Sequence, residues 1–143
     1  MDEALEQEFQ DSFGADLTSM HVARLDMLLW QGATSSAERM LPRVNSAQAN
    51  LAKARLALQN NENGVTRLLA NIPQSLKSDP GLAFDRFQWR LGRQKTQGAI
   101  EMLAAQSTSA ITLGLPEKWA GRRMSLARDL LWDENYQRAY DLA

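Results

Sequence analysis

The sequence predicts an all-α fold built from helical hairpins, an α-solenoid of irregular repeats that resemble tetratricopeptide repeats, with about eight helices. Three observations predict it. Apolar residues recur at helical spacing along most of the chain, and no segment shows the period-two alternation of a β-strand. The 4 prolines and 8 glycines fall between the apolar-periodic stretches, where helices begin and end. A stretch of helical sequence that ends on tryptophan also occurs three times.

The first 30 residues are expected to form two helices. Residues 2–13 make the first, which Gly14 closes because glycine is favoured just past a helix end. Thr18 is the expected N-cap of the second helix, with apolar residues around it at the spacing of a hydrophobic staple. This second helix runs to Trp30.

Capping residues mark the next two helices. Ser35 and Glu38 have the spacing of a capping box for a short third helix, which ends around Pro42. Asn45 or Ser46 begins the fourth helix. This helix is rich in alanine, which lets neighbouring helices approach closely, so we expect it to be buried on more than one side.

Proline and glycine divide the second half of the chain. A short helix over residues 65–72 ends at Pro73, and Asp79 followed by Pro80 gives an N-cap and a proline at the first helical position. The helix that begins there reaches about Leu91. The remaining expected elements are a partner helix around residues 99–103, a loop over 106–114, a long helix from Pro116 and a final helix from about Asn135.

An internal repeat joins a helix that ends on tryptophan to a following alanine-containing helix. The repeated tryptophans and arginines are Trp30 with Arg24, Trp89 with Arg86, and Trp132 with Arg128. The tryptophans are unequally spaced, so the repeat lacks the fixed period of tetratricopeptide proteins. One hairpin cannot bury both of its faces, so stacked neighbours would bury the tryptophans. We therefore expect these indoles, and Trp119 on the apolar face of the long helix, to be core; the alternative is a platform for stacking sugar rings.

Composition excludes several classes of function. The 16 basic and 17 acidic residues give a net charge of −1, so no global field draws the chain to nucleic acid. The absence of cysteine excludes disulfides, a thiol nucleophile and a thiolate metal site. The lone His21 has no second histidine to complete a zinc site, and no apolar run is long enough to cross a bilayer. We expect no metal, no cofactor and no transmembrane segment.

No catalytic constellation is expected. The sequence contains no glycine-rich phosphate loop, no nucleophile elbow and no metal-binding helix motif. Three aspartates lie beside the repeat arginines, and we expect helix ion pairs rather than a glycosidase-type pair of acids. They are Asp26, Asp85 and Asp129. A set of arginines forms either solvated faces or the lining of a groove for an anionic ligand. These are Arg39, Arg43, Arg90, Arg93, Arg122 and Arg123.

The two ends of the sequence suggest a piece of a longer protein. The N-terminus is acidic where a signal peptide would be basic and then apolar, which fits a cytoplasmic protein or an excised piece. The C-terminus stops inside an amphipathic helical pattern, without a glycine or proline to end it. The second observation favours the excised piece.

Four stretches, taken together and in order, carry a family resemblance. They are Phe13-Gly14 with Leu17-Thr18 and the run through His21 to Trp30 and Gly32; Met40-Leu41-Pro42; Asp79-Pro80-Gly81-Leu82 with Asp85-Arg86 and Trp89-Arg90; and Pro116-Glu117 with Trp119, Arg122-Arg123, Ala127-Arg128 and Ala139-Tyr140. From about residue 6 the chain resembles the superhelical U-type scaffold of soluble lytic murein transglycosylases, particularly those of alphaproteobacterial type.

The resemblance implies a periplasmic parent enzyme whose helical hairpins form a ring or horseshoe. A separate C-terminal lysozyme-like domain would cleave the glycan strands of peptidoglycan to 1,6-anhydromuropeptides, using one glutamate. The motif of that domain, glutamate then serine with a downstream glycine-leucine-methionine-glutamine stretch, is absent from this sequence. Residues 1–143 would then be a single scaffold fragment without a catalytic residue.

Two sets of partners follow from two interpretations. As a scaffold, the chain would contact neighbouring repeats and the catalytic domain of its parent, and would meet the glycan strand through the full-length enzyme. Arg90, Arg93, Arg122 and Arg123 are then the candidates to face glycan. The alternative is a free-standing helical-repeat adaptor that binds a protein or peptide on a concave face.

Overall fold

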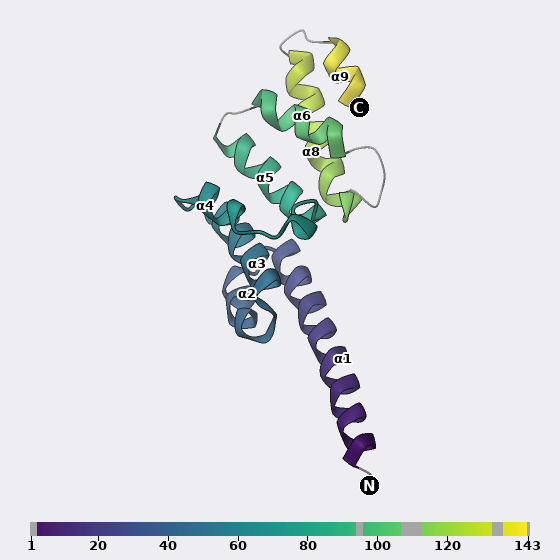
Figure 1. Cartoon of the computed structure of the whole chain (residues 1–143). Helices are drawn as coiled ribbons and strands as arrows, with labels where there is room; N and C mark the ends of the chain where they lie inside the picture. The colour runs from purple at the N-terminus through teal and green to yellow at the C-terminus, as the bar shows by residue number, and fades with distance from the viewer. Residues whose placement is uncertain (1–2, 94–95, 107–112, 133–135, 143) are drawn as a thin grey trace. The chain divides into compact units, whose positions relative to one another are not determined.

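The computed structural model describes residues 3–93, 96–106, 113–132 and 136–142. Within these ranges the chain forms eight α-helices and two short 3-10 turns, with no β-strand (Figure 1), which confirms the all-α prediction. The chain divides into two compact units, Met1–Leu76 and Lys77–Ala143. We call them the first and second units. No described helix is long and apolar enough to span a membrane.

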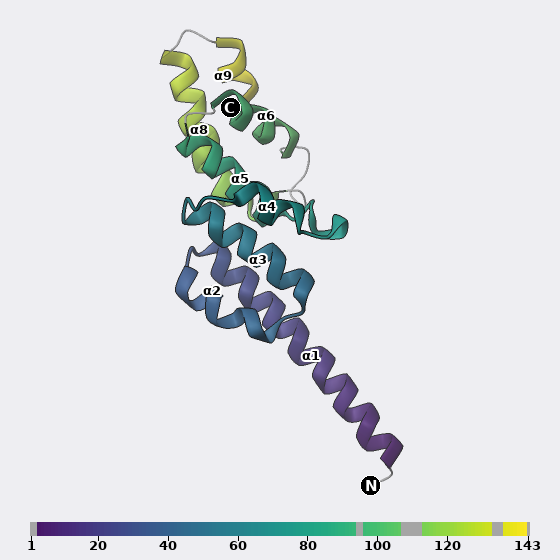
Figure 2. The same cartoon turned by 60° about the vertical axis from the view of Figure 1, so that its left-hand side comes forward.

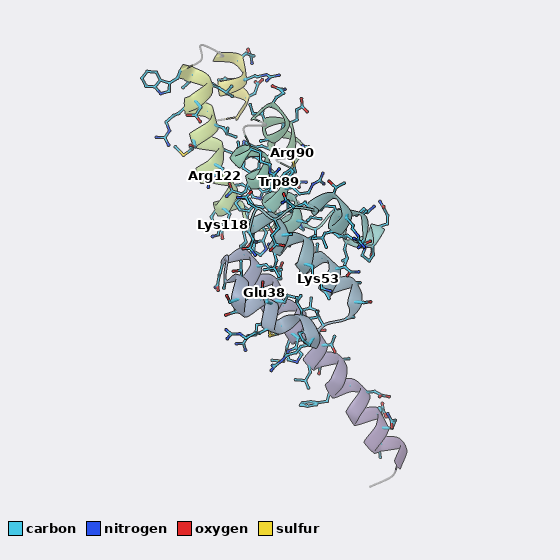
Figure 3. All side chains as sticks on the ribbon, turned by 90° about the vertical axis from the view of Figure 1, so that its left-hand side faces the viewer. Glu38, Lys53, Trp89, Arg90, Lys118 and Arg122 are labelled. Carbon is cyan, nitrogen blue, oxygen red and sulfur yellow. The ribbon has the colours of Figure 1, made fainter. Side chains whose placement is uncertain are left out.

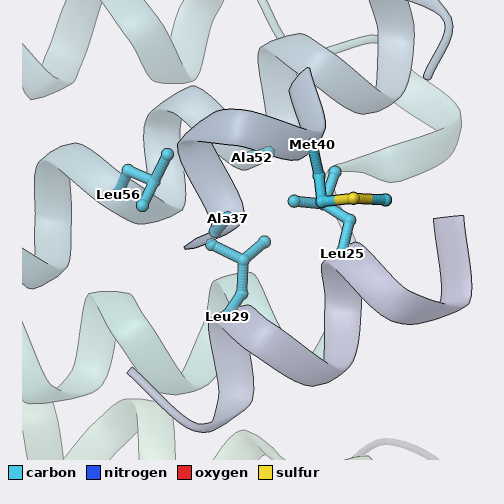
Figure 4. Close-up of a cluster of buried hydrophobic side chains, with 6 residues drawn as sticks. All are labelled: Leu25, Leu29, Ala37, Met40, Ala52 and Leu56. Carbon is cyan, nitrogen blue, oxygen red and sulfur yellow. The ribbon is translucent and has the colours of Figure 1, made fainter. Parts of the chain in front are cut away.

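Three helices build the core of the first unit. Its elements are α1 (Glu3–Trp30), α2 (Thr34–Met40), η1 (Leu41–Arg43), α3 (Ser46–Gln59), α4 (Val65–Ala70) and η2 (Gln74–Leu76). Helix α1 contacts α2 and α3, and α3 in turn contacts α4, as Figures 1 and 2 show. Figure 4 shows the aliphatic side chains that meet between α1, α2 and α3. They are Leu25, Leu29, Ala37, Met40, Ala52 and Leu56.

The prediction of two helices over the first 30 residues is wrong, because α1 is continuous. Gly14 lies inside the helix, and nothing lies within 4 Å of a Cβ placed on it. A glycine in a helix costs only about 1 kcal/mol relative to alanine, which is too little to end a helix flanked by good helix formers. Thr18 does not cap a helix; its hydroxyl donates to the Gly14 carbonyl at 2.9 Å, as helix-interior threonines commonly do.

The expected capping box at the start of α2 does not form. The helix begins at Thr34, and its N-cap is Ala33, whose side chain makes no capping hydrogen bond. The end of α1 explains the difference, because Gly32 has φ 70° and the amides of Gly32 and Ala33 donate to Leu29 and Leu28 carbonyls. This Schellman motif brings the chain directly into α2, one residue before Ser35.

Two other predicted caps are confirmed. The Asn45 side chain accepts a hydrogen bond from the Gln48 amide at 2.9 Å, and the Asp79 side chain accepts one from Leu82 at 2.9 Å. Helix α3 is buried on more than one side, as its alanine content predicted. Its buried residues are Leu51, Ala52, Ala54, Arg55, Leu56, Ala57 and Leu58.

The second unit is built around aromatic side chains. Its helices are α5 (Pro80–Gly92), α6 (Thr96–Gln106), α8 (Pro116–Trp132) and α9 (Tyr136–Leu142). Helix α5 contacts α6, and α8 contacts α9. Trp119 is fully buried, and its ring centroid lies 5.1 Å from those of Phe84 and Phe87. Its indole N–H donates to the Leu113 carbonyl at 2.9 Å. Of the loop predicted over 106–114, residues 107–112 lie outside the described ranges.

Candidate functional site

The four tryptophans have different surroundings. Trp119 is 0% exposed, as expected of a core residue, whereas Trp30 and Trp89 are only partly buried. Trp132 was expected in the core but is 86% exposed at the end of α8. The helix geometry explains this, because Leu130 faces the core and a residue two positions later lies more than half a turn away. Trp89 also differs from the predicted layout, since α5 continues beyond it to Gly92.

The repeat arginine of α1 does not pair with its neighbouring aspartate. Asp26 instead accepts a hydrogen bond from Arg55 of α3, with 2.8 Å between Nη1 and Oδ1. The Arg55 side chain is 1% exposed and that of Asp26 is 50% exposed, while Arg24 is exposed on the other side of α1. The Arg55 guanidinium also lies 5.3 Å from the centroid of the Trp30 ring. Sequence reasoning missed Arg55, although an arginine within a run of alanine and leucine was a signal for a buried cation.

The other two aspartates of the repeat belong to the second unit. Asp85 is buried within α5, and its neighbour Arg86 is partly buried. Arg128 is exposed and donates from Nε to the Met124 carbonyl at 3.4 Å, while the adjacent Asp129 is exposed too. Asp85 is buried and Asp129 is exposed, so the two carboxylates have different surroundings.

Helix α5 and its C-cap residue Arg93 carry a group of charged and aromatic side chains. Arg86, Trp89, Arg90 and Arg93 follow at separations of three, one and three residues, which places them on one side of a helix. Trp89 and Arg90 are labelled in Figure 3. We call these four residues the α5 cationic face. Of the four, Arg93 is exposed and the other three are partly buried.

Internal contacts hold the α5 cationic face in place. The Arg93 guanidinium lies 4.4 Å from the centroid of the Trp89 ring, a cation–π distance. Arg90 donates from Nη1 to the Gly98 carbonyl at 3.4 Å, which ties α5 to the start of α6. A Cβ on Gly98 would lie 3.3 Å from that Nη1 atom, so glycine permits this close approach. Burial lowers the pKa of Arg86, and the nearby charge of Arg90 lowers it further.

The remaining predicted arginines lie on other helices. Arg122 is exposed and Arg123 partly buried, both on α8 of the second unit, and Figure 3 labels Arg122. Arg39 and Arg43 belong to α2 and η1 of the first unit, where Arg39 donates to the Ser36 hydroxyl at 3.1 Å. The structure therefore distributes the six arginines over both units, and it places the guanidinium of Arg93 over the ring of Trp89.

The chemistry of the α5 cationic face suits an anionic ligand with a ring. Guanidinium groups bind carboxylates and phosphates through paired N–H donors, and an indole face contacts the apolar face of a sugar. A metal has no comparable site, since the described residues contain no group of three or more His, Cys, Asp or Glu able to hold one. His21 is a partly buried residue of α1.

Fold and site define an all-α chain with a cationic, tryptophan-bearing helix face. Comparison with known proteins finds no matching family model, no matching curated protein and no matching solved structure.

Proposed function

We propose that the chain is a non-catalytic helical scaffold of a periplasmic lytic murein transglycosylase, shaping the ring that positions the glycan strand. The ordered sequence motifs that resemble this family support the proposal. So does the pairwise contact of consecutive helices, α1 with α2, α3 with α4, α5 with α6 and α8 with α9, from which a superhelix of hairpins would be built. Cleavage would take place in a separate lysozyme-like domain.

The α5 cationic face is the observation that carries the glycan-facing part of the proposal. Peptidoglycan presents pyranose rings together with the carboxylates of its peptide groups. The Arg93 guanidinium lies 4.4 Å over one face of the Trp89 ring, so its donors are held beside the remaining surface of a partly exposed indole. A ligand that combines a sugar ring with a carboxylate would meet both at once.

Cosedimentation of the purified chain with murein sacculi tests this role. Arg93→Ala should weaken binding about tenfold, since losing a hydrogen bond to a charged group costs about 1.5 kcal/mol. Arg93→Lys should restore part of the affinity because it keeps the charge. The matched control is Arg67→Ala, which removes an exposed arginine from α4 of the other unit. Equal losses in Arg67→Ala and Arg93→Ala, or no binding by the wild-type chain, would contradict the proposal.

The absence of catalysis has its own test. Prolonged incubation of the chain with sacculi should release no 1,6-anhydromuropeptides, measured by chromatography of the soluble fraction. Their release would place lytic activity within these 143 residues and would refute the scaffold role as stated.

The second candidate function is a helical-repeat adaptor that binds a protein or peptide. The observation that favours it is the row of exposed apolar side chains on α1, among them Met20 and Met27. The flanking gene sequence discriminates between the two functions. Continuation of the reading frame into a lysozyme-like domain favours the scaffold, whereas an end near Ala143 without an upstream signal peptide favours the adaptor.

A further inference from the structure

The turn between α3 and α4 contains an asparagine followed by a glycine. Asn63 and Gly64 lie between Gln59, the last residue of α3, and Val65, the first residue of α4. No other asparagine of the sequence precedes a glycine. The backbone nitrogen that follows an asparagine can attack the side-chain amide carbon, and glycine leaves that nitrogen without a neighbouring Cβ to shield it. The pair therefore has the composition of a site at which asparagine changes covalently.

The backbone of this turn is held on both sides of the pair. On the α3 side, the Glu62 amide donates to the Ala57 carbonyl at 2.9 Å. On the α4 side, Gly64 is the N-cap with φ 81°, and its carbonyl accepts from the amides of Arg67 and Leu68 at 3.1 and 3.3 Å. These contacts use the carbonyl of Gly64 and leave its amide nitrogen out of the hydrogen bonds that fix the turn.

The two groups that would react are accessible. Asn63 and Gly64 are both exposed. Within the described ranges, neither the Asn63 side chain nor the Gly64 amide N–H makes a hydrogen bond. A Cβ placed on Gly64 would meet no atom within 4 Å beyond its chain neighbours, so the space beside this residue is open. The Asn63 side chain can therefore turn toward the Gly64 nitrogen without breaking a hydrogen bond.

The other asparagines of the first unit are held or shielded. Hydrogen bonds occupy the side chains of Asn45, Asn50 and Asn60. Asn61 precedes a glutamate, and Asn71 precedes an isoleucine, whose β-branched side chain crowds the backbone nitrogen. These differences favour reaction at Asn63 over the other positions.

We propose that Asn63 is a site of spontaneous deamidation in the folded chain, with the backbone nitrogen of Gly64 as the nucleophile. This nitrogen loses its proton to solvent and forms a bond to Cγ of Asn63. The bond from Cγ to the side-chain nitrogen breaks, and that nitrogen takes up a proton and leaves as ammonia. Water then opens the resulting five-membered succinimide ring at Cγ to give aspartate, or at the main-chain carbonyl carbon to give isoaspartate. The net change consumes one water and releases one ammonia.

Both products change the connection that leads into α4. Each adds a carboxylate, which makes the formal net charge of −1 one unit more negative. Isoaspartate also adds a methylene group to the main chain directly before the N-cap Gly64, two residues from the buried Val65. Deamidated chains should therefore separate from the parent as more acidic species on ion exchange. The site is independent of the glycan-binding role proposed above.

Incubation of the folded full-length chain in water labelled with heavy oxygen tests the proposal. The buffer is mildly alkaline, since loss of the amide proton precedes the attack, and digestion is carried out in ordinary water. Peptide mass spectrometry should find the label at residue 63, with conversion at least about tenfold faster than at any other asparagine, a barrier difference of about 1.4 kcal/mol. Asn63→Gln should abolish this labelling, because glutamine would have to close a larger ring.

A pair of glycine variants tests the nucleophile. Gly64→Ala should slow labelling at residue 63 about tenfold, because its Cβ shields the attacking nitrogen. Gly32→Ala is the matched control, since Gly32 also has a positive φ, 70°, and open space at its Cβ position. It introduces similar backbone strain at a different turn of the first unit and should leave labelling at residue 63 unchanged.

The possible results separate clearly. Labelling confined to residue 63, lost in Asn63→Gln and slowed only in Gly64→Ala, supports the site. Comparable labelling at another asparagine, or equal slowing in the two glycine variants, would overturn the assignment to the Asn63–Gly64 pair. Labelling of residue 63 in the urea-unfolded chain but not in the folded chain would refute deamidation in the folded state.

Discussion

The two units bury polar groups in different ways. In the first unit, an aliphatic core between α1, α2 and α3 lies beside a buried arginine, Arg55, which pairs with Asp26 of another helix. In the second unit, one buried polar atom belongs to Trp119, whose N–H donates to the carbonyl of Leu113, six residues earlier. The first contact joins positions 29 residues apart in the sequence. The second fixes the connection that leads into its own helix.

This difference bears on how each core responds to substitution. Arg55 is charged, so removal of its partner leaves a buried cation with fewer hydrogen bonds. Trp119 contributes mainly through its volume and its edge-on contact with Phe84, at an interplanar angle of 78°. We therefore expect the second unit to depend on packing volume and the first to depend on one long-range polar contact.

The largest effect is expected from Trp119→Ala. Removing a fully buried indole should lower the free energy of unfolding of the second unit by roughly 3 to 5 kcal/mol, since a cavity forms between Phe84 and Phe87. Urea denaturation followed by circular dichroism measures this loss. Trp132→Ala is the control, because that side chain is exposed and should leave the transition unchanged. Similar losses in the two variants would contradict the packing described for the second unit.

An intermediate effect is expected from Asp26→Ala in the first unit. It removes the partner of a buried guanidinium, and losing a hydrogen bond to a charged group costs about 1.5 to 3 kcal/mol. The exposure of Asp26 favours the lower end of that range. Arg24→Ala is the control, since Arg24 is exposed two residues away. If Arg24→Ala were as destabilising as Asp26→Ala, the pair with Arg55 would not be the source of the effect.

The smallest effect compares one glycine from each unit. Nothing lies within 4 Å of a Cβ placed on Gly14 of α1 or on Gly121 of α8, so alanine fits at both. Each substitution favours the helix by roughly 0.5 to 1 kcal/mol. Gly121→Ala should raise the urea midpoint of the second unit, because α8 packs on its core. Gly14→Ala should raise helical circular dichroism more than the midpoint, because its segment extends beyond the core. An equal midpoint shift in both variants would show that residues 11–20 unfold together with the first unit.

Features of the fold set by neighbouring residues were predictable from the sequence. The caps at Asn45 and Asp79 and the apolar face with Phe84 and Phe87 depend on side chains within a few positions of one another. The continuity of α1 was not predictable in this way. Gly14 and Thr18 carry boundary signals of about 1 kcal/mol each, and these are outweighed by a helix that continues on both sides.

The candidate site was predictable only in part. Arg90 and Arg93 were identified from the sequence as candidates to face glycan, and the structure adds Trp89 and Arg86 on the same side of α5. The contact of Arg90 with Gly98 depends on how α5 meets α6, which sequence periodicity does not determine. The partner of Arg55 was missed for the same reason, because it belongs to a distant helix. Long-range geometry decides which arginines are anchored inside and which remain available to a ligand.

The uninterrupted backbone of α1 has a consequence for its local opening. One hydrogen-bonded helix passes from a segment surrounded by solvent, at residues 11–20, to buried positions at Leu25 and Leu29. The free energy needed to expose an amide should therefore rise along this single helix, since opening near its N-terminus breaks no core contact. Hydrogen–deuterium exchange measured at each residue would report this increase in the free energy of local opening.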